Sequence, residues 1–179
     1  MGVISNITRS SGTDNKAGIS RTIYFALAED VQTWPTLPSG PATYQDLVKN
    51  DGAFAMKTGK QFWKFEATVR RSKLTFESAG ERGSKSVINR LEVIRATMDD
   101  DIFGFFESHK NDDLIFIVKD HEDNLRVLGT EDLPAKIEEF SGDSGADVSD
   151  DKHCKFIVES VGDIARVYTG QTIPLTPAA

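Results

Sequence analysis

The segment that decides the fold is QFWKFEATVRRSKLTFE, residues 61–77. In its first half, apolar residues at positions 63, 65, 67 and 69 alternate with polar residues. A period of two indicates a β-strand that buries one face. Beyond Arg71 the apolar residues move to even numbers, Leu74 and Phe76. Because a strand alternates its faces strictly, this change of phase predicts a β-bulge near residues 70–73.

A return strand is predicted at SVINRLEVIRAT, residues 86–97, after a turn at AGERGS, residues 79–84. With residues 61–77 it forms one long projecting β-hairpin, whose arms exceed the usual length of about five to six residues. Such a hairpin has exposed edges that neighbouring copies can pair. We predict inter-subunit contacts by Trp63, Phe65, Val69, Arg70, Arg71, Lys73, Leu91 and Val93. The alternatives are an ordinary core position for Trp63 and Phe65, and contact with water for the basic residues 70–73.

The remaining pattern predicts more strands and one good helix. Strands are expected at residues 19–27, 114–120, 125–130, 135–140, 155–160 and 164–168. A proline-bearing loop at 32–43 and a short helix at 44–50 follow the first of these. In MDDDIFGFFESHKND, residues 98–112, the three aspartates suit a helix N-terminus, and Ile102, Phe103 and Phe106 form its packing stripe.

No alternation of strand, helix and strand appears, so the predicted fold is mainly β (α+β). We expect an antiparallel β-sandwich or barrel with one flanking α-helix. The chain divides into a flexible N-terminal arm at 1–18, a single β domain at 19–170 and an extended C-terminal tail at 171–179. The sequence holds no apolar run of the about 20 residues that a membrane span requires, and no membrane partner is expected.

Charge is distributed unevenly along the 179 residues, whose formal net charge is −7. Residues 57–95 hold ten Lys or Arg and four Glu, whereas residues 97–153 hold seventeen acids and five bases. Opposite charges in adjacent segments suit a molecule that docks its own copies head to tail. Two differently charged solvated faces are the alternative. The overall acidity argues against a nucleic-acid-binding groove.

The tetrapeptide GDSG at residues 142–145 surrounds the nucleophile in chymotrypsin-like proteases, but a serine nucleophile also needs an oriented histidine base. His109 and His121 lie in acidic, turn-like contexts, so we interpret Ser144 as part of a turn that joins two strands. The aspartate clusters lack the spacing of a calcium loop, and no zinc or phosphate-loop pattern is present. We therefore predict no enzyme, no catalytic residue, no metal and no cofactor.

The layout of arm, long hairpin, acid-capped helix and the segment IFIVKDHEDNLRVLG, residues 115–129, resembles phage tail-tube proteins and their relatives in contractile injection systems. The resemblance covers roughly residues 19–170, and the proline-rich insert at 34–41 departs from the family pattern. It implies a structural virion protein, made in the bacterial host cytoplasm and located in the tail. Six copies would form a ring, and stacked rings would form a tube through which DNA passes without specific binding.

The partners implied by the resemblance are further copies of this chain and other tail proteins. The hairpins would join across subunits into one inner barrel, and the arm can order on a neighbouring ring. Two alternatives remain open. One is another virion structural role, such as a tail terminator, connector or decoration protein. The other is a monomeric β-sandwich that binds a ligand.

Overall fold

The computed structural model describes residues 6–7, 17–147, 150–170 and 172–178, so most of the predicted arm at 1–18 lies outside the described residues. The fold is mainly β, as predicted, with one α-helix. A six-stranded sheet has the order β3-β12-β9-β8-β1-β5, and a four-stranded sheet has the order β10-β11-β7-β6. Strands β2 and β4 form a small third sheet. All strand pairs are antiparallel except β3 with β12.

The six-stranded sheet consists of β1 (Ile19–Leu27), β3 (Lys49–Asn50), β5 (Trp63–Glu66), β8 (Leu114–Asp120), β9 (Leu125–Leu128) and β12 (Arg166–Tyr168). The four-stranded sheet consists of β6 (Lys73–Ala79), β7 (Ser86–Arg95), β10 (Lys136–Asp143) and β11 (His153–Gly162). The small sheet consists of β2 (Val31–Thr33) and β4 (Ala55–Met56), and single turns of 3-10 helix lie at Ala28–Asp30 and Asp46–Val48. The latter replaces the predicted helix at 44–50.

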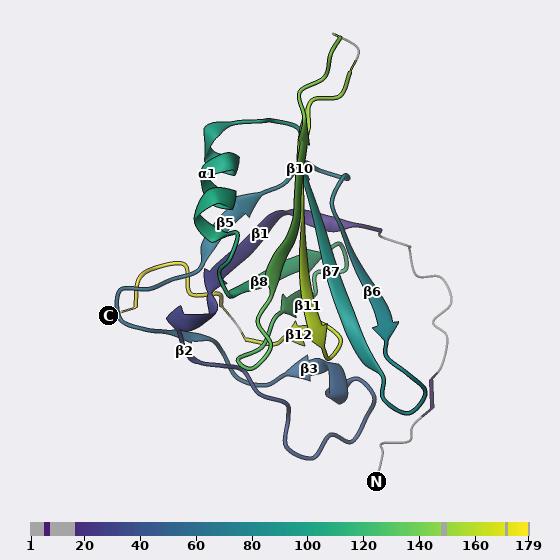
Figure 1. Ribbon diagram of the computed structural model, residues 1–179. Helices are drawn as coiled ribbons and strands as arrows, with labels where there is room; N and C mark the ends of the chain where they lie inside the picture. The colour runs from purple at the N-terminus through teal and green to yellow at the C-terminus, as the bar shows by residue number, and fades with distance from the viewer. Residues whose placement is uncertain (1–5, 8–16, 148–149, 171, 179) are drawn as a thin grey trace.

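The main core lies between the two large sheets. Alternate residues of β8 (Leu114, Phe116 and Val118) face Leu91 and Val93 of β7 and Phe156 and Val158 of β11 in one buried cluster. The rings of Phe65 and Phe156 meet edge to face across the layers, with centroids 5.2 Å apart. This packing makes the two sheets a sandwich, with the four-stranded sheet in front in Figure 1.

A second core covers the other face of the six-stranded sheet. Ile115 and Ile117, the remaining apolar residues of β8, pack there with Phe54, Met56 and Phe62. The segment between β1 and β5 and the C-terminal tail supply this cover. The tail is held by backbone bonds such as the one from Phe62 N–H to the Pro174 carbonyl, 2.8 Å. The five residues from Leu114 to Val118 are therefore buried on both sides.

Helix α1 (Asp100–His109) lies beside the sandwich near β5 and β10 (Figure 1). Asp99 caps it, accepting a bond from the Ile102 N–H at 3.1 Å. Burial opposes ionisation of Asp99, but the hydrogen bonds from Ile102 and Thr97 and the charge of Arg95 outweigh it and lower the pKa of its carboxyl. Ile102 is fully buried, and Phe106 stacks on Phe140 of β10 with centroids 4.3 Å apart. Phe103, also predicted to pack, is 40% exposed, but its ring still meets that of Phe140 edge to face with centroids 6.0 Å apart.

The predicted continuous strand at 61–77 is wrong. Its first half is β5, which pairs with β1 in the six-stranded sheet, and its second half is β6, which pairs with β7 in the other sheet. A turn between them contains Arg70 in the left-handed region, with φ 62°. The change of phase therefore marks a crossing between layers rather than a bulge within one strand.

The turn predicted at 79–84 does join β6 to β7. Gly80 has φ +94°, and a Cβ on it would clash with the carbonyl of Ser84, so this turn requires glycine. The resulting hairpin is shorter than predicted because its first arm begins only at Lys73. The end of the β10–β11 hairpin projects furthest from the body at the top of Figure 1. It carries the GDSG sequence at 142–145.

Candidate assembly surface

The four-stranded sheet has two free edges within the described residues. Strand β6 pairs only with β7, and β10 pairs only with β11. Six of the eight residues of β10 and five of the seven of β6 are exposed. An edge strand presents unpaired N–H and C=O groups, which can template pairing with another chain.

The directions of the strands make these two edges complementary. Every neighbouring pair in the order β10-β11-β7-β6 is antiparallel, so β6 and β10 run in opposite directions. If one copy is rotated about an axis parallel to the strands, its β10 approaches β6 of the next copy in an antiparallel sense. An even number of alternating strands can therefore continue as one antiparallel sheet around a ring of copies.

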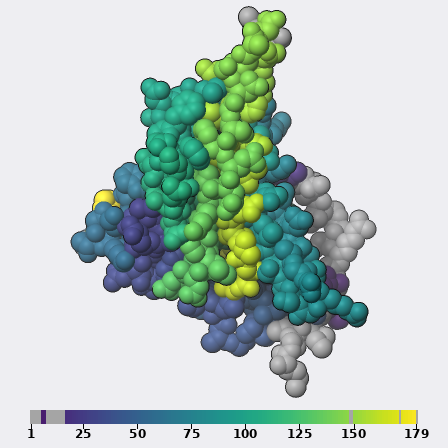
Figure 2. Space-filling model, viewed as in Figure 1, coloured from purple at the N-terminus to yellow at the C-terminus, as the bar shows by residue number. Residues whose placement is uncertain are grey.

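The outer face of this sheet, called the bare face, has no covering layer among the described residues, and Figure 2 shows its strands side by side at the surface. One ion pair crosses each ladder. Arg90 Nε lies 2.6 Å from Glu159 Oε1, and the Lys73–Glu92 and Lys155–Glu139 pairs are 3.5 Å apart. Ile88, Ile94, Ile157 and Val161 lie between these pairs in the pleat. The bare face thus carries ion pairs between neighbouring strands with aliphatic residues between them, and no described residue covers it.

Charge differs between the two edges. The chain at and just before the start of β6 carries Arg70, Arg71 and Lys73, whereas β10 carries Glu138, Glu139 and Asp143. Both sets lie at the same end of the sheet, since Lys73 pairs with Glu92, Glu92 with Ile157 and Ile157 with Glu139. Within one chain, Arg71 already binds Asp151, and this bond lowers the pKa of Asp151. Antiparallel docking of β6 on β10 would place the basic end against the acidic end.

The structure divides the residues predicted for the inter-subunit hairpin between core and surface. Phe65, Leu91 and Val93 are buried in the main core. Trp63 and Val69 are 57% and 54% exposed, and Arg70, Arg71 and Lys73 are exposed near the β6 edge. Trp63 is exposed, although it shares a face of β5 with the buried Phe65. The strand predicted at 135–140 matches the first part of β10, but sequence reasoning did not identify β10 as an edge for contact between copies.

The residues considered for chemistry lie apart from one another. Gly142 and Asp143 still belong to β10, and the Ser144 hydroxyl donates to the Gly145 carbonyl at 3.3 Å. His109 bonds Asp112 through Nδ1 and packs against Phe25 and Phe105. No cluster of three or more potential metal ligands occurs in the part of the chain that the structure describes. These positions give no geometry for a serine nucleophile and base.

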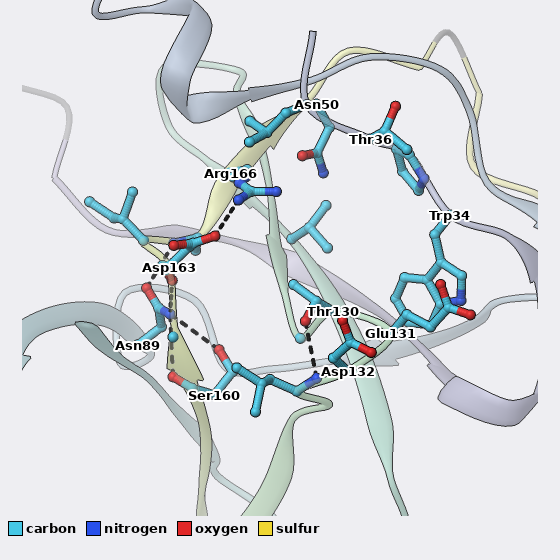
Figure 3. A pocket seen from close by; sticks show the side chains of 18 of the residues that line it. Trp34, Thr36, Asn50, Asn89, Thr130, Glu131, Asp132, Ser160, Asp163 and Arg166 are labelled. Atoms are coloured by element: carbon cyan, nitrogen blue, oxygen red, sulfur yellow. Dashed lines mark hydrogen bonds and ion pairs between the residues drawn. The ribbon is translucent and has the colours of Figure 1, made fainter. Parts of the chain in front are cut away.

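A cavity of about 390 Å³ is the other notable feature. It opens where the β2–β3, β9–β10 and β11–β12 connections meet (Figure 3). Asn50 of β3 is only 6% exposed, and its Oδ1 has no hydrogen-bond partner. Arg166 of β12 binds Asp163 through one guanidinium nitrogen, while its buried Nε is unpartnered. Figure 3 shows the Asn50 side chain directed into the cavity.

Comparisons of the chain with models of known protein families, with curated proteins and with solved structures find no match. Among the described residues, none of the helical segments has the length and apolar character needed to cross a bilayer.

Proposed function

We propose that this protein is the structural subunit of a phage tail tube, whose copies join edge to edge into rings that stack as a conduit for DNA. The observation that carries the proposal is the four-stranded sheet with two long, free and oppositely directed edges. Six copies would give one inner barrel from six such sheets. Closure would remove both exposed edges of the four-stranded sheet, which is the physical reason to expect a ring rather than a monomer.

The uneven covering of the two sheets supports the same proposal. Loops and the C-terminal tail cover the outer face of the six-stranded sheet, whereas no described segment covers the corresponding face of the four-stranded sheet. In the proposed ring the bare face lines the lumen. Its three ladder ion pairs present acidic and basic groups already neutralised by one another. Such a surface offers DNA no basic stripe to grip.

The test is assembly of the purified full chain. Analytical ultracentrifugation and negative-stain electron microscopy should detect closed rings or hollow tubes as concentration rises. A species that stays monomeric at millimolar concentration, or open aggregates without a lumen, would contradict the proposal. The edges are tested with two charge-reversed variants. One is Arg70→Asp with Lys73→Glu next to and on β6, and the other is Glu138→Lys with Asp143→Lys on β10.

Each reversed variant alone should fail to form rings, because its β6 and β10 edges then carry like charges. Mixed in equal amounts, the two variants should assemble, since each altered edge then meets an edge of opposite charge. All four positions are exposed, and the contacts they lose are surface contacts such as the Lys73–Glu92 pair, so the variants should stay folded and lose only about 1 kcal/mol of stability each. A matched control is Glu122→Lys in the β8–β9 turn, away from both edges, which should leave assembly unchanged.

The cavity favours a second candidate, a monomeric β-sandwich that binds a small ligand. Its volume of about 390 Å³ falls within the usual range for ligand sites. The same sedimentation experiment separates the candidates, because a binding module has no need of ring closure.

A further inference from the structure

The cavity combines an unsatisfied polar wall with an exposed apolar mouth. A buried acceptor without a partner lowers the stability of a fold by roughly 1–3 kcal/mol. Asn50 Oδ1 is such an acceptor, so a hydrogen bond from an occupant would be stabilising. Arg166 Nε is an unpartnered donor on the neighbouring strand. A peptide group offers one N–H and one C=O, and so could satisfy both atoms. The site is therefore better matched to a peptide segment than to a purely apolar molecule.

Exposed apolar side chains surround this polar wall. Leu37, Leu133, Val161 and Ile164 are 43%, 51%, 48% and 37% exposed, and all four line the cavity. Trp34 and Phe54 contribute aromatic faces, with their rings 5.8 Å apart. A cluster of exposed apolar groups at a concave site is typical of a surface that another chain covers. An occupant should thus bring an aliphatic side chain.

The acidic residues at the rim of the cavity favour an occupant that carries a basic residue. Asp163 is neutralised by Arg166, but Glu131 and Asp132 lie exposed on the rim. An aliphatic residue two positions before a basic residue, in the sequence Ile7-Thr8-Arg9, meets these requirements. Ile7 is 87% exposed in the single chain, the largest exposure of any large apolar residue described. The described residues of its own chain therefore leave Ile7 unburied.

We propose that this cavity receives the segment around Ile7 and Arg9 of a second copy of the chain. Ile7 enters the apolar mouth, Arg9 lies against Glu131 and Asp132, and a peptide group between them bonds Asn50 and Arg166. The inference rests on the proposed function, because it requires a second copy, and it names a contact apart from the β6 and β10 edges.

The direct test is a titration with the acetylated peptide GVISNITRSSG, residues 2–12. The host is the full chain with Trp63→Phe, which leaves Trp34 as the reporter, and with Arg9→Glu, which weakens competition from its own segment. Saturable, blue-shifted Trp34 emission is expected, with at least tenfold weaker binding for the peptide carrying Arg9→Glu or Ile7→Ser. Absence of a saturable change up to millimolar peptide would overturn the inference.

Two host variants distinguish a binding role from a structural one. Asn50→Leu should weaken peptide binding at least about tenfold while thermal stability stays equal or rises, because it removes an unpaired buried acceptor. Glu131→Lys with Asp132→Lys should weaken binding of the native peptide and restore binding of the Arg9→Glu peptide. Glu122→Lys is the matched charge control and should change neither. If the affinity for the peptide is the same in all these variants, the peptide binds elsewhere and the proposal is contradicted.

Disulfide trapping distinguishes docking between two copies from docking within a single copy. Full chains with Ile7→Cys and Leu133→Cys are mixed as ¹⁴N- and ¹⁵N-labelled protein and oxidised. Cross-linked peptide pairs of mixed label support docking between copies, whereas pairs of a single label only would refute it. Peptide binding is measured on the host that also carries Arg70→Asp and Lys73→Glu, which prevent ring formation, whereas rings are tested on the parent chain, so the two proposals can fail separately.

Discussion

The two large sheets share a core, yet they differ in what lies on their outer faces. Strand β8 of the six-stranded sheet buries Leu114 to Val118 without interruption, because cover lies on both sides. Strand β11 of the four-stranded sheet buries only alternate residues, from Cys154 to Ser160. The sheet covered on both faces is buried along most of its central strand, whereas the sheet covered on one face leaves its other face and two edges accessible among the described residues.

Truncation in the doubly covered sheet should have the largest effect. Ile117→Ala removes a fully buried side chain from the second core, and we expect it to lower the free energy of unfolding by about 2–5 kcal/mol. Urea denaturation followed by circular dichroism measures this. A loss below about 1 kcal/mol would mean that the loops and tail cover the sheet only loosely.

The cover itself can be tested through Tyr168. Its buried hydroxyl accepts a hydrogen bond from the Phe54 N–H at 3.2 Å and donates to the Thr172 carbonyl at 2.9 Å. Tyr168→Phe should destabilise the protein by about 1–3 kcal/mol, since it leaves the buried Phe54 N–H without this acceptor and removes the bond to the Thr172 carbonyl. Thermal unfolding provides the measurement, with the exposed Tyr44→Phe as control. Equal midpoints for the two variants would argue against a tightly docked cover.

The helix cap should have a smaller effect that depends on pH. Asp99→Ala removes the N-cap and should cost about 1 kcal/mol at neutral pH. Because the folded pKa of Asp99 lies below its ordinary value of 3.8, its contribution is present above that value and is lost as pH falls through the folded pKa. The stability curves of parent and variant should therefore converge in acid. Asp101→Ala, in the first turn, is the control, and curves that stay parallel would contradict the assignment.

The smallest effect is expected on the bare face. Ile157→Ala should lower monomer stability by about 1 kcal/mol or less, because the side chain is only half-buried and leaves no enclosed cavity. Ile157→Ala and Ile117→Ala are a matched pair, because the same substitution is made once in each of the two large sheets. A loss as large as that of Ile117→Ala in the isolated monomer would show that the two faces are covered alike.

The local pattern of apolar and polar residues located most strands and the helix of this fold, but it did not show which strands pair. The predicted strands at 19–27 and 86–97 and the helix after Asp99 match β1, β7 and α1. The phase change near Arg71 was placed correctly and interpreted wrongly, because a bulge and a crossing between sheets give the same shift of apolar positions. The pairing of Trp63 with Phe25, which decides between them, joins residues far apart in the sequence.

The sequence by itself determined the β-rich class, the acid-capped helix and the segregation of basic and acidic segments, since each depends on residues a few positions apart. The free edge strands, the bare sheet face and the meeting of Asn50 and Arg166 at one cavity became apparent only from the folded arrangement. These properties depend on pairing and burial between distant segments, and such contacts leave no period in the local sequence.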